Sequence, residues 1–477
     1  MSKKKTVLVS GNFNVLHPGH LRLLRFAKEC GDRLVVAVQS DKLAGQGAHV
    51  PEQLRLEGVQ AIGQVDEAFL TDGPIGELVA RLKPDVVVKG KEHESKFNPE
   101  LAVLQGYGGR LIFSSGESAF SSLDLLNKEV HPEQLNSISL PHDYLKRHRI
   151  GHARLRELIQ GFARARVLVV GDIIVDEYIT CDPLGMSRED PTIVVTPVST
   201  ARFVGGAGIV AAHAAGMGAQ AHFITVTGAD ATRDYVEREL GEMNVKFDLL
   251  VDDSRPTSLK QRYRCQGKSM LRVSHLHQGA IATPLQHKLL GLVEDALAHA
   301  DVLVFSDFNY GCLPQPVVDE ITRMAKARGV LLCADSQSSS QVGDISRYIG
   351  MDVLTPTEHE ARLATRNRDD GLVVLAETLR RKADARNVLL KMGEEGMLVH
   401  VGDPDYNWLT DRISALNIAP RDVAGAGDSL LIASALTLAA GGDIWEAAVL
   451  GSLAAAVQVG RVGNVPIQAD ELLKELA

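Results

Sequence analysis

The chain has 477 residues, of which 45% are hydrophobic and 23% charged, and its formal net charge is −9. This length exceeds one ordinary hydrophobic core, so we expect two or three domains of globular composition. The negative charge and the low aromatic content of 5% argue against a nucleic-acid partner.

The cysteines and the hydropathy pattern predict in which cellular compartment the protein resides. The five cysteines are scattered, with no Cys-x-x-Cys pair or Cys/His cluster that would suggest zinc, which fits reduced thiols. The basic start "MSKKKTVLVS" has too short an apolar run for a signal peptide, and no apolar stretch reaches the roughly 18 residues of a membrane span. We therefore expect a cytoplasmic protein without a membrane partner.

Short β-branched runs alternate with amphipathic helical stretches from residue 6 onward. Residues 6–10 and 33–41 read as strands on either side of a helix over 20–31, and the same alternation continues to residue 115. Continuous apolar runs predict strands that are covered on both faces, hence a parallel α/β sheet. The sequence predicts a first domain over residues 1–135.

A second block of alternating strands and helices follows a basic stretch. Residues 136–164 contain a polar segment and a basic amphipathic helix, which we interpret as a solvated linker helix. A strand at 166–179 opens a second domain over 165–477, in which 191–204 and 256–276 read as a small sheet laid over the main one. The predicted fold class is α/β, with two doubly wound parallel-sheet domains, Rossmann-like and then ribokinase-like with a small β lid.

The segment "GNFNVLHPGH", residues 11–20, joins the first predicted strand to the first predicted helix. Such a turn places the free N–H groups and the positive dipole end of the helix at the carboxyl edge of the sheet, which suits phosphate. His17 and His20 flank that point, and Gly19 lets the backbone approach closely. One histidine would more often be a cap, but two beside a glycine favour donors to phosphoryl oxygens.

A second glycine-rich turn, "DVAGAGDSL", opens a long apolar helix near the end of the chain. Gly425, Ala426 and Gly427 leave unencumbered N–H groups at the helix N-terminus, an oxyanion cradle for a transferred γ-phosphoryl group. Asp428 can accept the proton of an attacking hydroxyl as general base. An aspartate in the first turn of a helix is also often only a helix cap. Other segments of the chain must therefore decide between a cap and a general base.

The first segment resembles the HxGH nucleotidyltransferase superfamily, in its cytidylyltransferase-like branch, over roughly residues 5–130. The family pattern G-x-F-D-x-x-H-x-G-H is matched except that Asn14 replaces the aspartate. The resemblance implies that a sugar phosphate attacks the α-phosphorus of a nucleoside triphosphate, with Mg²⁺ and release of pyrophosphate. It implies a catalytic pair, His17 and His20, and nucleotide-binding residues at Gly11, Phe13, Gly19, Arg55, Lys89, Ser121 and Ser122.

The second domain resembles the ribokinase (PfkB) family of carbohydrate kinases over roughly residues 165–472. "DVAGAGDSL" matches its D-T-x-G-A-G-D turn, "FVGGAGIVAAHAAGMGA" its N-terminal glycine signature and "LTPTEHEA" its N-x-x-E element. Ile209 and Thr357 stand where the family has asparagines, and "LVFSDFNYG" lacks a lysine that relatives carry beside the position of Asn309.

This resemblance implies ATP as phosphoryl donor, Asp428 as catalytic base, an anion hole at Gly425–Gly427 and Glu360 as the residue that organises Mg²⁺. The implied sugar-binding residues are Asp172, Asp176, Gly205, Gly206, Lys260 and Arg272. The implied nucleotide-binding residues of the kinase are Lys391, Gly393, Gly396 and Asn464.

Together the halves resemble the bifunctional heptose 7-phosphate kinases/heptose 1-phosphate adenylyltransferases, with the usual domain order reversed. The implied function is phosphorylation of a sugar phosphate followed by nucleotidyl transfer to the sugar 1-phosphate, with ADP-heptose as the leading product. Two alternatives stay open: the same reactions on another sugar or polyol phosphate, for example CDP-linked, or one inactive domain acting as a binding or regulatory module. The expected partners are ATP, a sugar phosphate and a second copy of the chain, through the kinase lid.

Overall fold

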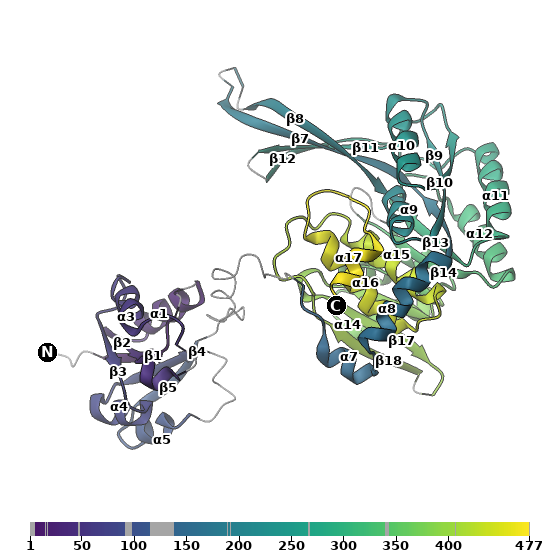
Figure 1. Ribbon diagram of the computed structural model, residues 1–477. Coiled ribbons are helices and arrows are strands. Elements are labelled where there is room, and N and C mark those ends of the chain that lie inside the picture. Colours follow the sequence, from purple (N-terminus) through teal and green to yellow (C-terminus); the bar gives the residue numbers. More distant parts are fainter. Residues whose placement is uncertain are drawn as a thin grey trace. The chain divides into compact units, whose positions relative to one another are not determined.

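The computed structural model forms two compact units, Met1–Asn136 and Ser137–Ala477, which are described separately (Figure 1). The structure describes residues 5–14, 16, 18–45, 48–90, 98–114, 138–187, 189–190, 192–265, 268–338, 343–405 and 407–476. Within this part of the chain, no helix combines the length and apolar character needed to cross a membrane.

The first unit is a five-stranded sheet in the order β3-β2-β1-β4-β5, and every neighbouring pair is parallel. Alternate residues of β1 enter separate cores: Val7 and Val9 join Leu24 of α1, whereas Leu8 joins Leu78 of α4. The strands are β1 (Thr6–Gly11), β2 (Arg33–Gln39), β3 (Glu67–Thr71), β4 (Val86–Gly90) and β5 (Arg110–Ser114). The helices are α1 (Pro18–Glu29), α2 (Asp41–Ala44), α3 (Glu52–Gln60), α4 (Ile75–Leu82) and α5 (Glu100–Gln105).

The order of the strands creates a binding position in this unit. The chain runs from β1 outward to β2 and β3 and then returns to β4 on the other side of β1. In open α/β sheets the loops that follow two such strands diverge, and ligands bind outside the carboxyl ends of these strands. The predicted doubly wound sheet is confirmed, and this expected binding position, which we call the crevice, lies where "GNFNVLHPGH" begins.

The second unit contains a nine-stranded sheet in the order β10-β9-β6-β13-β14-β15-β16-β17-β18. The strands are parallel from β10 to β16, and β17 and β18 continue the sheet in antiparallel fashion. They are β6 (Arg166–Gly171), β9 (Gln220–Thr227), β10 (Lys246–Val251), β13 (Val302–Asp307), β14 (Leu331–Ser336), β15 (Val353–Leu354), β16 (Asn387–Lys391), β17 (Met397–Asp403) and β18 (Asn407–Ile413).

Helices cover both faces of this sheet, because its strands are apolar on both sides. They are α9 (Ala207–Gly216), α10 (Ala231–Glu242), α11 (Thr283–Leu297), α12 (Gln315–Ala327), α13 (Glu358–Thr365), α14 (Leu372–Lys382), α15 (Ala426–Ala439), α16 (Ile444–Val459) and α17 (Ala469–Lys474). Short 3₁₀ turns occupy Phe162–Arg164, Ile345–Arg347 and Gly393–Glu395.

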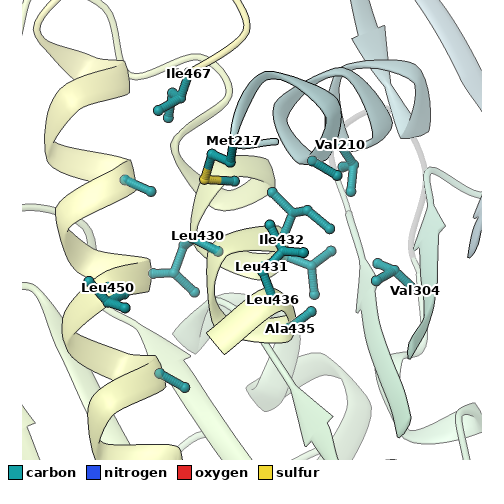
Figure 2. Packing of buried hydrophobic residues seen from close by; sticks show 14 of the residues in the cluster. Val210, Met217, Val304, Leu430, Leu431, Ile432, Ala435, Leu436, Leu450 and Ile467 are labelled. Carbon is teal, nitrogen blue, oxygen red and sulfur yellow. The ribbon is translucent and has the colours of Figure 1, made fainter. Parts of the chain in front are cut away.

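Helix α15 is apolar on all sides, and it is buried for that reason. Figure 2 shows its side chains, among them Leu431 and Leu436, packed between Val210 of α9, Leu450 of α16 and Val304 of β13. This packing fixes the N-terminus of α15 at the carboxyl edge of the sheet.

A separate four-stranded sheet, the lid, has the order β12-β11-β7-β8. Its strands are β7 (Ile173–Met186), β8 (Ile193–Gly206), β11 (Leu259–Cys265) and β12 (Lys268–His275), which confirms the predicted small sheet. The predicted single strand over 166–179 is instead divided at Asp172, where the chain leaves β6 in the main sheet and enters β7 in the lid.

The interpretation of residues 136–164 as a solvated linker helix is wrong for the described residues from 138 onward. They form α7 (His142–His148) and α8 (His152–Gly161), which pack into the core of the second unit. Tyr144 of α7 and Leu155 of α8 are buried, and the Tyr144 ring lies near Trp445 of α16. Leu155, Leu158 and Ile159 recur at helical spacing in α8, so one face of this helix is covered despite the basic side chains nearby.

Candidate active sites

The first candidate site lies at the crevice of the first unit. Gly11 ends β1, and Gly19 and His20 lie in the first turn of α1. Phe13 is buried with φ +51°, and its ring centroid is 5.2 Å from that of His20. A Cβ at Gly11 would come within 3.2 Å of the Phe13 ring, so glycine leaves room for this arrangement. The predicted residues His17, Ser121 and Ser122 lie outside the described residues.

Arg55 of α3 is buried, and it organises the loops around this crevice. Its Nε donates to the carbonyl of Val50 (2.7 Å), and its Nη1 donates to the carbonyls of Asn12 (2.6 Å) and Gln39 (2.7 Å). Its Nη2 donates to Asp41 Oδ1 at 2.6 Å, and this bond lowers the pKa of Asp41. The guanidinium is thus engaged with the protein itself, and it shapes the crevice by holding the ends of β1 and β2.

Lys89 lies at the end of β4, on the other side of the crevice. Its ammonium donates to Asn98 Oδ1 at 2.8 Å and forms an ion pair with the buried Glu100 of α5. Asn14, which replaces the family aspartate, accepts the N–H of His49 at 3.0 Å through its Oδ1. Asn14 therefore fixes the loop that precedes α3 in this chain.

The second candidate site begins at the N-terminus of α15. Gly425 has φ +77°, a conformation that favours glycine, and a Cβ there would lie 2.5 Å from Asn464 Oδ1. Ala426 and Gly427 form the first residues of α15, so the N–H groups of its first turn lie at the carboxyl edge of the sheet. This is the geometry of an anion-binding helix end.

Asp428 is buried in that first turn and accepts a hydrogen bond from Gln337 Nε2 at 3.3 Å. Burial and the negative charge of Asp335 raise the pKa of Asp428 to about 7, although Lys391 opposes this shift. A carboxylate with a pKa near 7 can take up a proton at neutral pH, as a general base must.

Four groups gather around Asp176 of the lid strand β7. Its carboxylate lies 3.3 Å from Arg262 Nη2 and 3.4 Å from Asn464 Nδ2, and a Cβ at Gly205 would lie 2.5 Å from its Oδ2. Burial raises the pKa of Asp176, while Arg262 and Lys260 oppose the shift. Asn464 was predicted to bind the nucleotide, but the structure places it beside Asp176 and Gly425.

Three other predicted sugar-binding residues, Lys260, Arg272 and Gly206, lie in different environments. Lys260 Nζ lies 5.4 Å and 5.2 Å from the ring centroids of Phe308 and Tyr310. Arg272 is exposed on β12, opposite Arg262 in the strand register. Gly206 has φ +58°, and a Cβ there would lie 2.4 Å from the carbonyl oxygen of Asp172.

Asp172, at the junction of the main sheet and the lid, holds a loop. Its carboxylate accepts the backbone N–H groups of Phe308 (2.9 Å), Tyr310 (3.1 Å) and Cys312 (3.1 Å). Burial and the nearby charge of Asp307 raise its pKa to about 6. Three backbone donors use much of the capacity of this carboxylate, so Asp172 shapes the floor of the site through the loop after β13.

Glu360 belongs to a capping box at the start of α13. Its Oε2 accepts the N–H of Thr357 at 2.7 Å and its Oε1 accepts the N–H of Ser338 at 3.1 Å, while Thr357 Oγ1 accepts the N–H of Glu360 at 3.2 Å. Thr357, which replaces the family asparagine, therefore serves as the helix cap.

A metal ion at this site would depend on ligands beyond the protein. Among the described residues, no three His, Cys, Asp or Glu side chains form a group that could hold a metal. Mg²⁺ commonly binds through one or two carboxylates, several waters and the phosphates of a nucleotide. The remaining lone pairs of Glu360 fit such a water-mediated role.

Lys391 is the last residue of β16, and its side chain lies against the glycine-rich turn Gly425–Gly427. Its Nζ is 3.0 Å from both carboxylate oxygens of Asp335 in β14, and a Cβ at Gly427 would lie 3.1 Å from the same nitrogen. Gly393 (φ +60°) and Gly396 (φ +92°) form the turn between β16 and β17, where a Cβ at Gly396 would lie 2.1 Å from the Ile413 carbonyl oxygen.

Comparison with known families agrees with this geometry. Residues 164–469 match the model of the pfkB family carbohydrate kinases. The chain belongs to the PfkB family. Residues 8–110 match the cytidylyltransferase-like family, so the nucleotidyltransferase-like segment precedes the kinase, as predicted.

Relatives of this PfkB chain carry the name "Bifunctional protein HldE". The protein from Bradyrhizobium sp. (strain ORS 278) is 31% identical over 328 residues, and that from Rhodopseudomonas palustris (strain TIE-1) is 33% identical over 328 residues. Each match covers 67% of this chain and 65% of the relative, so the chain spans slightly less than two thirds of the length of these relatives.

Solved structures similar to this PfkB chain show its fold. Phosphofructokinase-2 from Escherichia coli in complex with substrates and products has a TM-score of 0.54 at 17% identity, covering 65% of this chain and 98% of that one. Arabidopsis thaliana ribokinase complexed with ribose and ATP has a TM-score of 0.52 at 18% identity, covering 66% of this chain and 99% of that one.

One residue of the PfkB site escaped the sequence analysis. Asp335 is buried and ion-paired with Lys391, and it raises the pKa of Asp428. It belongs to no motif that we recognised. The available signal was an acidic residue at the end of the apolar run "GVLLCAD", because the ends of parallel strands meet at one edge of a sheet.

Proposed function

We propose that this chain is a bifunctional enzyme that phosphorylates C1 of a sugar phosphate and, after a separate phosphatase has removed the original phosphate, couples the sugar 1-phosphate to a nucleotide, with ADP-heptose as the product. The observation that carries the kinase half is the position of Asp428, buried in the first turn of α15 directly after the Gly425–Gly427 turn. The identity of the relatives as bifunctional proteins supports the pairing of the two activities.

In the first step, the anomeric hydroxyl of the sugar attacks the γ-phosphorus of ATP. Asp428 accepts the hydroxyl proton, the new O–P bond forms, and ADP leaves with the electron pair of the broken bond. N–H groups at the start of α15 stabilise the charge on the transferred phosphoryl group. Asp176, Asn464 and Lys260 surround the position for the sugar. Bound Mg²⁺ would neutralise phosphate charge, with Glu360 holding its waters.

In the second step, an oxygen of the sugar 1-phosphate attacks the α-phosphorus of a second nucleoside triphosphate, and pyrophosphate leaves. This displacement requires no side-chain nucleophile, so positioning and charge stabilisation suffice. The start of α1 with His20, beside the end of β4 with Lys89, supports this assignment. Arg55 would act by shaping the crevice, since its donors are engaged by the protein.

Two substitutions test the proposal separately, and the full chain serves for both. Asp428→Asn should abolish ATP turnover with heptose 7-phosphate but leave pyrophosphate release from supplied heptose 1-phosphate unchanged. His20→Ala should stop only the pyrophosphate release. Loss of both steps in either variant would contradict two separate sites. A panel of other sugar and polyol phosphates, with product masses, identifies the substrate, and CTP in place of ATP identifies the nucleotide.

We also propose that two copies associate through the kinase lid. Apolar side chains of β7 and β8 are strongly exposed on this sheet, among them Leu184 (67% exposed) and Met186 (60%). Covering them in a dimer would remove this apolar surface from water. The molecular mass of the full chain in solution tests the assembly.

A further inference from the structure

The ion pair between Asp335 and Lys391 is unusual because Asp335 is buried and Lys391 is almost so. The side chain of Asp335 is 2% exposed and that of Lys391 is 13% exposed. Removing two charges from water costs several kcal/mol each, and such a pair often contributes less stability than apolar residues of similar size. A need for stability is therefore a weak explanation for this pair.

The position of the pair offers a better explanation. Asp335 ends β14 and Lys391 ends β16, so both lie at the carboxyl edge of the sheet, where α15 begins. A Cβ at Gly427 would lie 3.1 Å from Lys391 Nζ, which means that the ammonium lies against the backbone of the glycine-rich turn. The positive charge therefore adjoins the N–H groups that form the anion hole.

The hydrogen bonds of Lys391 leave a donor for a ligand. An ammonium has three N–H groups, and the two bonds to Asp335, each 3.0 Å, account for two of them. Burial lowers the pKa of Lys391, but the adjacent charges of Asp335 and Glu360 offset this and raise it overall. Lys391 thus stays protonated, and it is held on one side by a carboxylate.

We propose that Lys391 is a catalytic residue whose ammonium binds an oxygen of the transferred phosphoryl group, and that Asp335 is the positioning residue that points it there. The inference rests on the proposed kinase function. No bond to Lys391 forms or breaks: the phosphoryl group moves from ATP to the sugar hydroxyl, and the hydroxyl proton moves to Asp428. Lys391 interacts with the charge that develops on the equatorial oxygens during this transfer.

The same pair acts on the general base. Charged groups from four elements face Asp428: Asp335 from β14 and Asp176 from β7 raise its pKa, and Lys391 from β16 and Lys260 from β11 lower it. Removing the charge of Asp335 should therefore lower the pKa of Asp428, whereas removing that of Lys391 should raise it. An ion pair that lies away from Asp428 would not shift its pKa, so opposite shifts report that both charges face the general base.

The test compares Lys391→Met and Asp335→Asn in the full chain with ATP, Mg²⁺ and heptose 7-phosphate. Lys391→Met should lower kcat by about 100-fold, as does the loss of one oxyanion-hole donor. Asp335→Asn should lower kcat by about 10-fold, in the range for residues that orient a primary ligand. The KM values should change little, because the interaction strengthens in the transition state.

The pH profile of kcat/KM is the second readout. Its acid limb should move to lower pH in Asp335→Asn and to higher pH in Lys391→Met. Glu377→Gln is the matched control, since Glu377 of α14 is also ion-paired and poorly exposed, with Arg380 and His400 as partners outside the site. Glu377→Gln should not shift the pH profile of kcat/KM. Unchanged kcat in Lys391→Met, or shifts of equal sign, would overturn the proposal.

A binding measurement separates this inference from the proposed function. Aluminium fluoride with Mg·ADP mimics the transferred phosphoryl group and requires no sugar turnover. Lys391→Met should weaken binding of this mimic by about 100-fold and binding of Mg·ADP alone much less, because ADP lacks the transferred group. A thermal unfolding transition like that of the wild type shows that the variant is folded. Absence of turnover in the wild type would contradict the proposed function only, whereas equal binding of the mimic by wild type and variant would contradict the role of Lys391.

Discussion

At the scale of single residues, Asp428, our proposed general base, lies in an environment that disfavours its ionised form. It is buried beside Asp335 and Asp176, and these surroundings raise its pKa to about 7 from the ordinary value of 3.8. The ionised form is therefore stabilised less in the folded protein than in the unfolded chain. The proposed role as general base needs the ionised form, because only a carboxylate can accept a proton from a sugar hydroxyl.

The raised pKa of Asp428 predicts opposite effects of pH on activity and stability. The kinase rate should rise through pH 7 as Asp428 ionises. Between pH 4 and 7 the folded state binds more protons than the unfolded state, so the contribution of Asp428 to the free energy of unfolding falls as pH rises. Asp428→Asn should therefore raise Tm at pH 8 by about 5 °C, since a pKa raised from 3.8 to about 7 corresponds to roughly 4 kcal/mol. In a unit of this size, 1 kcal/mol shifts Tm by roughly 1–2 °C.

Calorimetry of the wild type and Asp428→Asn at pH 4 and pH 8 measures this effect. The gain in Tm should be small at pH 4, where Asp428 is protonated in the folded protein and only partly ionised when unfolded. An equal Tm difference at both pH values would show that the substitution acts through packing and would contradict the raised pKa.

The sequence predicted residues whose roles depend on local backbone geometry. The turn at Gly425 and the placement of Asp428 follow from a glycine-rich segment before an apolar helix, and the structure has both. Arg55 was expected to bind the nucleotide, but its bonds to the protein could not be predicted, because its four partners come from separate segments between Asn12 and Val50. Asp335 was missed for the same reason: its partner Lys391 is 56 residues away.

At the scale of elements, α7 and α8 show how composition misled the interpretation. Their many basic residues suggested solvent on all sides, yet several of these are ion-paired across the unit. Arg147 donates to both carboxylate oxygens of Asp411 at 2.9 Å, and the His148 ring stacks on Trp445 with centroids 4.2 Å apart. The helical periodicity was readable in the sequence, but the surface that covers the apolar face was not.

We predict that α7 contributes to the stability of the kinase unit. Tyr144 is buried against His148 and Trp445, so Tyr144→Ala should lower the free energy of unfolding by about 3–5 kcal/mol, as for other large buried aromatic residues. Urea denaturation of the full chain, followed by tryptophan fluorescence, measures the loss. Lys146→Ala, on the exposed side of the same helix, is the control and should change stability by about 0.5 kcal/mol or less. Equal effects of both substitutions would mean that α7 is not part of the core.

At the scale of the whole molecule, both sites occupy the same kind of position. Each lies outside the carboxyl ends of parallel strands, at β1 and β4 in one unit and at β6, β13, β14 and β16 in the other. The parallel α/β class was predictable from continuous apolar runs. The strand order was not, because it depends on which connections return across the sheet, and this order decides which strand ends meet.

Since each unit has its own core and its own candidate site, we predict that the two steps can be divided between two molecules. With a phosphatase that removes the 7-phosphate present throughout, the wild-type chain should convert heptose 7-phosphate and ATP to ADP-heptose, whereas Asp428→Asn and His20→Ala should each fail. An equimolar mixture of the two variants should restore the conversion, because His20→Ala supplies heptose 1,7-bisphosphate, the phosphatase converts it to heptose 1-phosphate, and Asp428→Asn consumes the heptose 1-phosphate. Mass spectrometry follows the amounts of heptose 1-phosphate and ADP-heptose with time. At low protein concentration the mixture should show a lag while heptose 1-phosphate accumulates in solution. A mixture that accumulates heptose 1-phosphate without forming ADP-heptose would place Asp428 in both reactions and contradict the division of the chemistry between the units.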